Sequence, residues 1–293
     1  MKRFLLPALT SLTFAGSFVA GKYTNVDLGP LTTTLIRYLI AIMFLAALIP
    51  HYGKKSLSVA SKDLIWMFLL GALGVVAYHY FFFSSLKYTQ AANSAIINAM
   101  NPLITGTCAA LLLRERLPLA AYIGVVIAFV GEVVLLCRGD INRLLSFDFN
   151  IGELLMLLGV LSWVAYSLII KRLMDRYSGF TVTFYAAVFG ILQLLGLVWI
   201  EPMAGLSSIS SASVWSLIYM GVGASGIGYF LFNLSLGSIG PTRTASAVYS
   251  LLPVFVATLA FLFFGEPITL IMILSTVLIV IGLNFAMREK KPS

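Results

Sequence analysis

The chain has 293 residues, of which 60% are hydrophobic and only 10% are charged. Soluble proteins are nearer half apolar and a quarter charged, so this composition excludes an ordinary soluble enzyme, a disordered chain and a secreted disulfide scaffold. A net charge of +8 would suggest nucleic-acid binding in a soluble protein, but here the basic residues lie in short loops between apolar segments, so we expect no nucleic-acid partner.

Long apolar segments follow one another along the chain. A membrane-spanning helix needs about 20 residues, so ten spans need about 200, which this chain can supply. The segments are longer than the roughly 10 residues of a barrel strand and do not alternate, which excludes an outer-membrane barrel. We predict an all-α membrane protein with ten transmembrane helices, at residues 4–22, 30–49, 63–86, 90–113, 118–138, 151–171, 179–200, 213–237, 241–264 and 267–287.

The first segment has two interpretations. Lys2 and Arg3, an apolar run and the small residues Val19-Ala20-Gly21 resemble a cleavable signal peptide. The same segment has a counterpart in the second half of the chain, which favours a retained first helix. We expect the helix to be retained.

Lys and Arg segregate when the ten segments are threaded through a bilayer from an internal N-terminus. Fourteen basic residues then lie inside and four outside, with Arg37 left within a span. Cytoplasmic loops of membrane proteins carry an excess of Lys and Arg. We therefore expect a multi-pass protein of the bacterial inner membrane, with both termini in the cytoplasm.

The two halves of the chain resemble each other at an offset of 149 residues, which becomes 151 further along. Matching pairs are Trp66 and Trp215, Gly74 and Gly223, Pro102 and Pro253, Glu115 and Glu266, and Gly131 and Gly282. Each half contains five expected spans, so the second half begins on the opposite side of the membrane and is inverted. We expect repeats at 1–140 and 150–288, with a cytoplasmic tail at 289–293. Inverted repeats around a midplane site are typical of secondary transporters.

Several motifs carry a family resemblance. They are FSSLKYTQAA at 83–92, NPL at 101–103 and LRERL at 113–117 in the first half, and LPV at 252–254 and FGEPI at 264–268 in the second. This pattern resembles the repeat unit of the drug/metabolite transporter superfamily, in its EamA-type ten-helix branch. The resemblance implies a basket of ten helices around a central cavity. It also implies export of amino acids, aromatic ones among them, or of other small metabolites.

Arg37 and Glu132 are charged residues that fall well inside expected spans, away from the span ends. A charge in hydrocarbon costs at least about 2.5 kcal/mol, so each needs a reason. Arg37 and Glu132 both lie roughly 10 Å from the outer ends of their helices, so we hypothesise a buried ion pair or shared polar network. Alternatively, Arg37 extends outward and Glu132 faces a water-filled vestibule. Glu132 is also a candidate for proton coupling.

Polar side chains in the third and fourth spans are candidates for the substrate site. His79 lies beside Tyr78 and either lines a cavity or is a satisfied packing residue; it lacks partners for a metal site. Asn98 and Asn101 are three residues apart and share a helix face, next to Pro102, which frees a backbone carbonyl. They either bind an amino acid's charged groups or join neighbouring helices.

Aromatic residues recur at similar depths in the two halves and could line the same cavity. Membrane proteins are rich in aromatic residues in any case, which leaves ordinary packing as the alternative. The aromatic candidates for the substrate site, besides Tyr78, are Phe14, Trp163, Tyr166, Tyr229 and Tyr249.

The sequence Gly221-Val-Gly223-Ala-Ser-Gly226 fits a G-x-G-x-x-G pattern inside an apolar segment. A dinucleotide site needs a strand before that pattern, so we assign these small residues to close helix packing. We expect a monomeric secondary transporter without cofactor or metal, moving a small metabolite across the lipid bilayer, most of all an amino acid for export. The alternatives are a multidrug or cation exporter, an intramembrane enzyme and a channel.

Overall fold

The structure is a computed structural model that describes residues 2–47, 57–104, 107–108, 119–136, 140, 142, 150–173, 176–201, 209–229, 231–232, 235 and 241–286. All of the regular secondary structure in these residues is helical. In lipid only helices and closed barrels satisfy every backbone polar group, and the long apolar segments of this chain adopt the first solution.

The first half contains α1 (Lys2–Asp27) and α2 (Pro30–Ala47), followed by one long helix from Ser61 to Tyr88. That helix comprises the short η2 (Ser61–Asp63), α4 (Leu64–Leu70), the π-helical segment η3 (Gly71–Ala77) and α5 (Tyr78–Tyr88). The half continues with α6 (Ala91–Asn98) and α8 (Leu119–Leu136).

The second half contains α10 (Ile151–Leu173) and α11 (Gly179–Leu197), which η4 (Val198–Ile200) extends. Next come α12 (Ser211–Ile218) and the π-helical segment η6 (Tyr219–Gly228), then α14 (Pro241–Phe264) and α15 (Leu270–Ala286). The two π-helical segments lie at matching places of the sequence repeat, since 71–77 plus the offset of 149 gives 220–226.

Five helices of the described residues are long and apolar enough to cross a membrane: Pro30–Ala47, Ser61–Tyr88, Ile151–Ile170, Gly179–Ile200 and Ala247–Phe264. Shorter apolar helices cover Val126–Leu135 and Leu270–Gly282. A helix lies within each of the ten ranges expected from sequence, while the number of membrane crossings stays a prediction.

Two boundaries differ from the sequence expectation. α1 runs to Asp27, five residues beyond the expected end at residue 22. The expected span at 90–113 is interrupted, because α6 ends at Asn98 and helix resumes only at Asn101. Pro102 has no N–H to donate to the carbonyl four residues earlier, so the helical ladder loosens at this turn.

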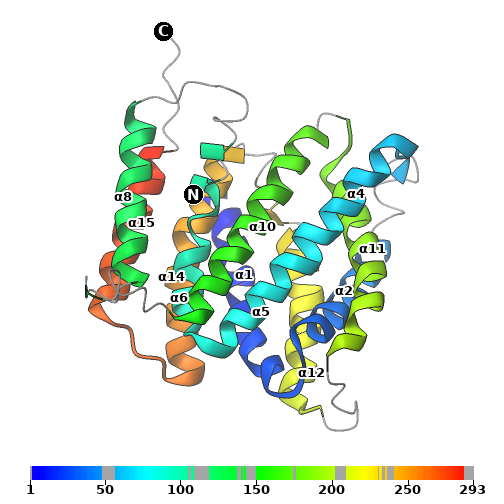
Figure 1. Cartoon of the computed structure of the whole chain (residues 1–293), viewed down its shortest axis with the longest axis horizontal. Coiled ribbons are helices and arrows are strands. Elements are labelled where there is room, and N and C mark those ends of the chain that lie inside the picture. Colours follow the sequence, from blue (N-terminus) through cyan, green and yellow to red (C-terminus); the bar gives the residue numbers. More distant parts are fainter. Residues whose placement is uncertain are drawn as a thin grey trace.

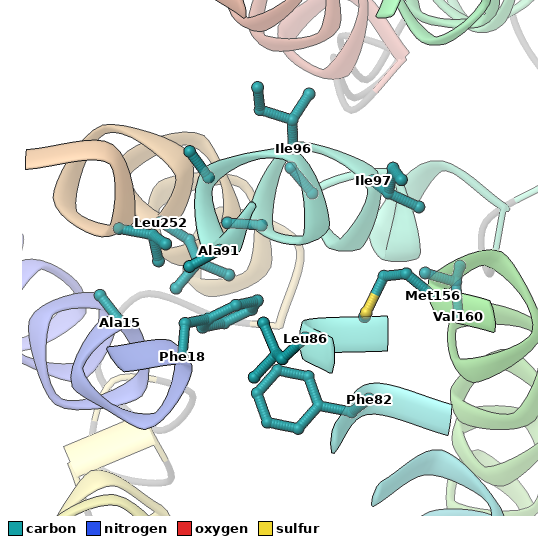
Figure 2. Close-up of a cluster of buried hydrophobic side chains, with 14 of the residues drawn as sticks. Ala15, Phe18, Phe82, Leu86, Ala91, Ile96, Ile97, Met156, Val160 and Leu252 are labelled. Atoms are coloured by element: carbon teal, nitrogen blue, oxygen red, sulfur yellow. The ribbon is translucent and has the colours of Figure 1, made fainter. Parts of the chain in front are cut away.

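The main hydrophobic core joins helices from both halves of the chain. Figure 2 shows Phe18 of α1, Phe82 and Leu86 of α5, Met156 of α10 and Leu252 of α14 directed toward one another beside α6. Each of these side chains is buried. The core therefore fixes α1, α5, α6, α10 and α14 relative to each other.

α8 and α15 pack against each other at one edge of the molecule, while α2, α4 and α11 lie at the opposite edge (Figure 1). A Cβ atom added at Gly282 would lie 2.5 Å from the backbone oxygen of Gly124, and one at Gly131 would lie 3.1 Å from that of Ser275. Later residues of α8 thus meet earlier residues of α15, so the two helices are antiparallel.

α2 and η6 also approach closely through glycine. A Cβ atom at Gly221 would lie 2.5 Å from the Ile40 side chain, and one at Gly226 would lie 2.6 Å from Phe44. The G-x-G-x-x-G sequence is therefore part of a helix that packs tightly, as expected, and it follows the helix α12 rather than a strand.

Candidate functional site

Arg37 is a charged residue that is buried among the described helices. It lies on α2, two turns from Pro30, and only 5% of its surface is exposed. Its Nε donates a hydrogen bond of 2.9 Å to the Oγ of Ser225 in η6. The close approach of η6 to α2 at Gly221 makes this contact possible, because a larger residue would hold the two backbones apart.

Glu132 is not the partner that the structure gives to Arg37. The side chain of Glu132 lies outside the described residues, but its helix α8 packs against α15 and α6, whereas α2 packs against η6, α11 and α5. Figure 1 places α8 and α2 at opposite edges of the molecule. Arg37 is instead bonded to a neutral hydroxyl. The residues of the expected tail, 289–293, and Glu115 also lie outside the described part of the chain.

Aromatic rings from both halves meet beside Arg37. The ring of Tyr78 lies 4.9 Å from that of Trp163, measured between centroids, and Trp163 lies 4.8 Å from Tyr166. The Tyr166 ring packs directly on Gly74, where any side chain would collide with it. Tyr78 also lies near Arg37.

The remaining aromatic candidates join the same cluster. Phe14 of α1 contacts Tyr229 edge-on, with 5.6 Å between the ring centroids. Tyr229 lies near Arg37, and Tyr249 of α14 lies near Tyr78 and Tyr229. The structure thus brings together aromatic residues that the sequence analysis selected from five separate helices.

His79 is held by its own helix. Its Nδ1 lies 3.1 Å from the carbonyl oxygen of Gly74 and 3.0 Å from that of Val75, so Nδ1 carries the proton that these acceptors require. The ring is 2% exposed and meets the rings of Tyr38 and Tyr78 edge-on at 5.2 and 5.0 Å. These contacts match the packing alternative for His79.

Asn98 and Asn101 share a helix face, as the spacing predicts, and they bond to each other. The Nδ2 of Asn101 donates to the backbone oxygen of Asn98 at 3.0 Å and also to the Asn98 Oδ1. The backbone oxygen of Asn98 is the acceptor that Pro102 cannot use, so the Asn101 amide replaces the missing bond. Tyr78 donates a long hydrogen bond of 3.5 Å to the same Oδ1.

Asn101 retains an unused acceptor. Its Oδ1 is buried and has no hydrogen-bond partner among the described residues. A buried polar atom without a partner costs about 1–3 kcal/mol, so such an atom is a candidate contact for a ligand.

A small cavity lies beside the Arg37–Ser225 contact. Its volume is about 20 Å³, measured as the space open to the centre of a water molecule, which is enough for one water. Its lining includes Tyr38, Tyr166, Thr183, Ser225 and Tyr229. The central site is therefore nearly closed in this conformation.

Sequence reasoning missed Tyr38, Thr183 and Ser225. Tyr38 follows Arg37 directly, but adjacent residues of a helix point in different directions, so adjacency gave no signal. Ser225 lies among the small residues of η6, and whether it has a role in the site depends on the residue that faces it, which the sequence does not show. Segments of π-helix are frequent at functional sites, but the π-helical geometry of η6 is visible only in the structure.

The ends of the helices carry charges that are already bound. Lys22 of α1 pairs with Glu266, and Glu266 also accepts a bond of 3.1 Å from the backbone N–H of Ala91 at the start of α6. At another connection, Arg176 donates to the buried Asp63 at 2.9 Å. These ion pairs join separate helices at their ends, a region called the rim below.

A larger cavity of about 470 Å³ opens at the rim beside Lys22, with Thr89, Asn93 and Thr269 in its lining. Next to it the fully buried Glu153 accepts a hydrogen bond of 3.0 Å from Asn93. The cavity lies at the ends of the helices and away from the aromatic cluster.

Comparison with known proteins gives consistent results. A sequence model of the EamA-like transporter family matches residues 2–137 and 150–288. An uncharacterized transporter of Bacillus subtilis, YyaM, is 28% identical over 93% of this chain and 89% of its own length. A solved crystal structure aligns over 97% of this chain and 96% of its own with a TM-score of 0.68; at 20% identity this shows a shared fold.

Two further relatives have more specific names. A probable terminal-alkyne amino-acid exporter of Streptantibioticus cattleyicolor is 26% identical over 88% of this chain and 84% of its own length. An S-adenosylmethionine uptake transporter of Rickettsia prowazekii is 25% identical over 88% of this chain and 81% of its own length.

Proposed function

This chain belongs to the EamA-like transporter family, and from that premise we propose that it exports an amino acid or related small metabolite by alternating access. The resemblance that the sequence motifs carried is thereby confirmed. The family and the apolar helices make the chain a multi-pass membrane protein. The proposal adds that it acts as a monomer in the inner membrane, with both termini cytoplasmic and no cofactor.

Packing supports the inverted repeat that alternating access requires. α1 packs against α14 and η6, and its counterpart α10 packs against α6 and the α5–η3 helix. A close contact also recurs in the two halves. Gly71 of η3 meets Gly190 of α11, and Gly221 of η6 meets Ile40 of α2. With the offset of 149, Gly71 and Gly190 correspond to positions 220 and 41, each one residue from the second contact. The antiparallel α8–α15 pair is the arrangement expected of two inverted copies. Transporters of this kind rock one half against the other around a central site.

The observation that carries the proposal is the mixed polar and aromatic cluster to which both halves contribute. The first half supplies Phe14, Arg37, Tyr78 and Asn98, and the second supplies Trp163, Tyr166, Ser225, Tyr229 and Tyr249. Polar groups inside a membrane are costly and mark substrate pathways. The unused Asn101 Oδ1 is an acceptor that an ammonium group would satisfy.

The relatives support amino acids as the first class to test. One is named as an exporter of an amino acid and the other as a transporter of S-adenosylmethionine. An α-amino acid group is the chemical part that these two compounds share. The two relatives are named for opposite directions of transport, export and uptake, and export is the direction that we propose for this chain.

The experiment is counterflow in proteoliposomes. The purified protein is first screened by thermal stabilisation against the common amino acids, because a bound substrate raises stability by mass action. The amino acid that stabilises most is then loaded inside vesicles and its labelled form added outside. We expect saturable accumulation, which a channel does not produce. Absence of both stabilisation and counterflow for every amino acid would refute this function.

A matched pair of variants locates the site. Trp163→Ala removes a ring of the central cluster, whereas Trp199→Ala removes a ring that is 75% exposed at the rim. We expect counterflow to fall at least about tenfold in the first variant, since that corresponds to only about 1.4 kcal/mol. The second variant should transport like the wild type. Equal transport by both variants would place the site elsewhere.

A further inference from the structure

Among the described residues, no acidic side chain is paired with the positive charge of Arg37. The helices that pack against α2 include α5, α11, α12 and η6, and these described helices contain no Asp or Glu. α1 carries one acid, Asp27 at its end, which accepts hydrogen bonds from Ser210. Glu201, after η4, binds the backbone N–H groups of Leu31 and Thr32 at the start of α2.

Such a charge is expensive inside a protein. Removing an ion from water costs several kcal/mol even after the surroundings relax, and a neutral hydroxyl recovers little of this. Charges at the rim illustrate the usual solution, since Lys22 and Arg176 each pair with a carboxylate of the protein. Arg37 departs from that rule at the place where substrate is proposed to bind.

The geometry of the guanidinium leaves its outer edge available. Nε is used by Ser225, and the two terminal nitrogens have no hydrogen-bond partner among the described residues. Those two nitrogens form a planar fork that matches the two oxygens of a carboxylate. Ser225 therefore acts as a positioning residue that holds the fork in one orientation.

We propose that Arg37 binds the carboxylate of the transported metabolite, with Ser225 orienting the guanidinium, so that the site selects anionic or zwitterionic substrates over cations. This inference rests on the proposed function. One positive charge balances one carboxylate, whereas a phosphate group carries nearly two negative charges at neutral pH. The cavity beside Ser225 has room for only one water molecule, so a carboxylate enters when the two halves separate.

The first test compares three probes of similar size and different charge: sodium benzoate, benzamide and benzylamine hydrochloride. Each is titrated against the purified full-length protein in nanodiscs while the melting temperature is recorded at constant ionic strength. We expect near-saturating benzoate to raise the melting temperature by about 2–4 °C and the other two to have no comparable effect. A shift from benzamide or benzylamine as large as that from benzoate, or no shift from benzoate, overturns the proposal.

Variants assign the selectivity to Arg37. Arg37→Gln should abolish the benzoate shift, and Arg37→Lys should reduce it, because Lys keeps the charge and loses the planar fork. Arg172→Gln is the matched control, since it removes the same charge from an exposed side chain stacked on Trp66. A benzoate shift that survives Arg37→Gln, or is lost equally in Arg172→Gln, contradicts the assignment.

A second measurement uses no ligand. Arg37→Met removes the buried charge. The Ser225→Ala background is used because the Ser225 hydroxyl would otherwise lose the hydrogen bond that Arg37 donates to it. If the protein holds no partner for Arg37, this variant should melt at or above the temperature of Ser225→Ala alone. A large fall in melting temperature would reveal an acidic partner within the protein, because breaking a buried ion pair is strongly destabilising, and would overturn the proposal.

Failure of this inference is distinguishable from failure of the function. If amino-acid counterflow is found and is unchanged in Arg37→Gln, the transporter stands and Arg37 is not its carboxylate site. If counterflow is absent while benzoate selectivity depends on Arg37, the anion site stands and amino acids are the wrong substrate class.

Discussion

The α8–α15 crossing and the α2–η6 crossing are built by the same means and differ in what lies beside them. In each, glycine lets one helix approach another so closely that an added Cβ atom would lie 2.5 Å from the nearest atom. At α8–α15 the atom met by Gly282 is a backbone oxygen. At α2–η6 the contact of Gly221 lies next to the Arg37–Ser225 hydrogen bond.

The difference shows that a glycine contact by itself indicates only that two helices lie close together. Both crossings join a helix of the first half to a helix of the second half. The α2–η6 crossing in addition brings the Arg37 guanidinium within hydrogen-bonding distance of the Ser225 hydroxyl. Stability should therefore depend most on the first crossing, and substrate selectivity on the second.

The largest effect on stability should come from Gly282→Ala. The new methyl group would lie 2.5 Å from Gly124 O and 2.6 Å from Ala128 N, which are backbone atoms that cannot rotate away. We expect a loss of about 3 kcal/mol, at the upper end of typical overpacking costs. Thermal unfolding in nanodiscs measures it.

The control for that prediction is Gly196→Ala. No atom lies within 4 Å of a Cβ at Gly196. Alanine favours a helix over glycine by up to about 1 kcal/mol, so this variant should be neutral or slightly stabilised. A similar loss of stability in both variants would mean that the α8–α15 contact is not the cause.

Gly221→Ala should destabilise somewhat less, by about 2 kcal/mol, because its nearest neighbour is the Ile40 side chain rather than backbone. It should also weaken the benzoate shift, since separating η6 from α2 pulls Ser225 away from Arg37. Melting temperatures with and without benzoate separate the two effects. An intact benzoate shift in this variant would show that the crossing does not position the site.

Ser225→Ala should have a smaller effect on stability, about 1.5 kcal/mol, the low end for a hydrogen bond to a charged group. Its effect on selectivity should exceed that of Gly282→Ala. Ser162→Ala is the control, because the one partner of Ser162 among the described residues is Leu158 O, within its own exposed helix turn. Should Ser162→Ala and Ser225→Ala give equal benzoate shifts, Ser225 has no positioning role.

The smallest effect should come from Asp27 at the rim, beyond the expected span 4–22. Hydrogen bonds from the Ser210 hydroxyl and backbone N–H lower the pKa of Asp27 below its ordinary value of 3.8. The stabilisation is therefore present above pH about 4 and is lost as the pH falls through the lowered pKa. Asp27→Asn should melt at a slightly lower temperature than wild type at pH 6, and the difference should shrink as the pH falls below about 4. A constant difference across that range would rule out this carboxylate as the titrating group.

Much of the helical framework follows from the order of residues alone. Apolar segments near 20 residues long become helices because lipid offers the backbone no hydrogen-bond partner. The spacing of Asn98 and Asn101 predicted a common face, and the two amides do meet. The break after Asn98 was less predictable, since it depends on how the Asn101 side chain replaces the bond that Pro102 cannot make.

The partner of Arg37 shows where prediction from sequence fails. Arg37 and Glu132 lie at similar depths in their expected spans, which suggested that they pair. Depth along the membrane normal does not say which helices are neighbours, and α8, which carries Glu132, packs against α15 and α6. Ser225 lies 188 residues from Arg37 and was hidden in a run of small residues. Choosing between the two required knowing which helix faces α2, and that depends on the packing of several helices at once.

Composition and hydropathy by themselves determined that this chain forms apolar helices, because the transfer of apolar side chains into lipid and the need to bond every peptide group are local requirements. The motifs determined the family. Only the tertiary structure decided that the aromatic residues of five helices converge, and that one buried arginine faces a hydroxyl instead of an acid. Both outcomes depend on contacts between helices far apart in sequence, and at Gly74 and Gly221 the absence of a side chain permits the close approach.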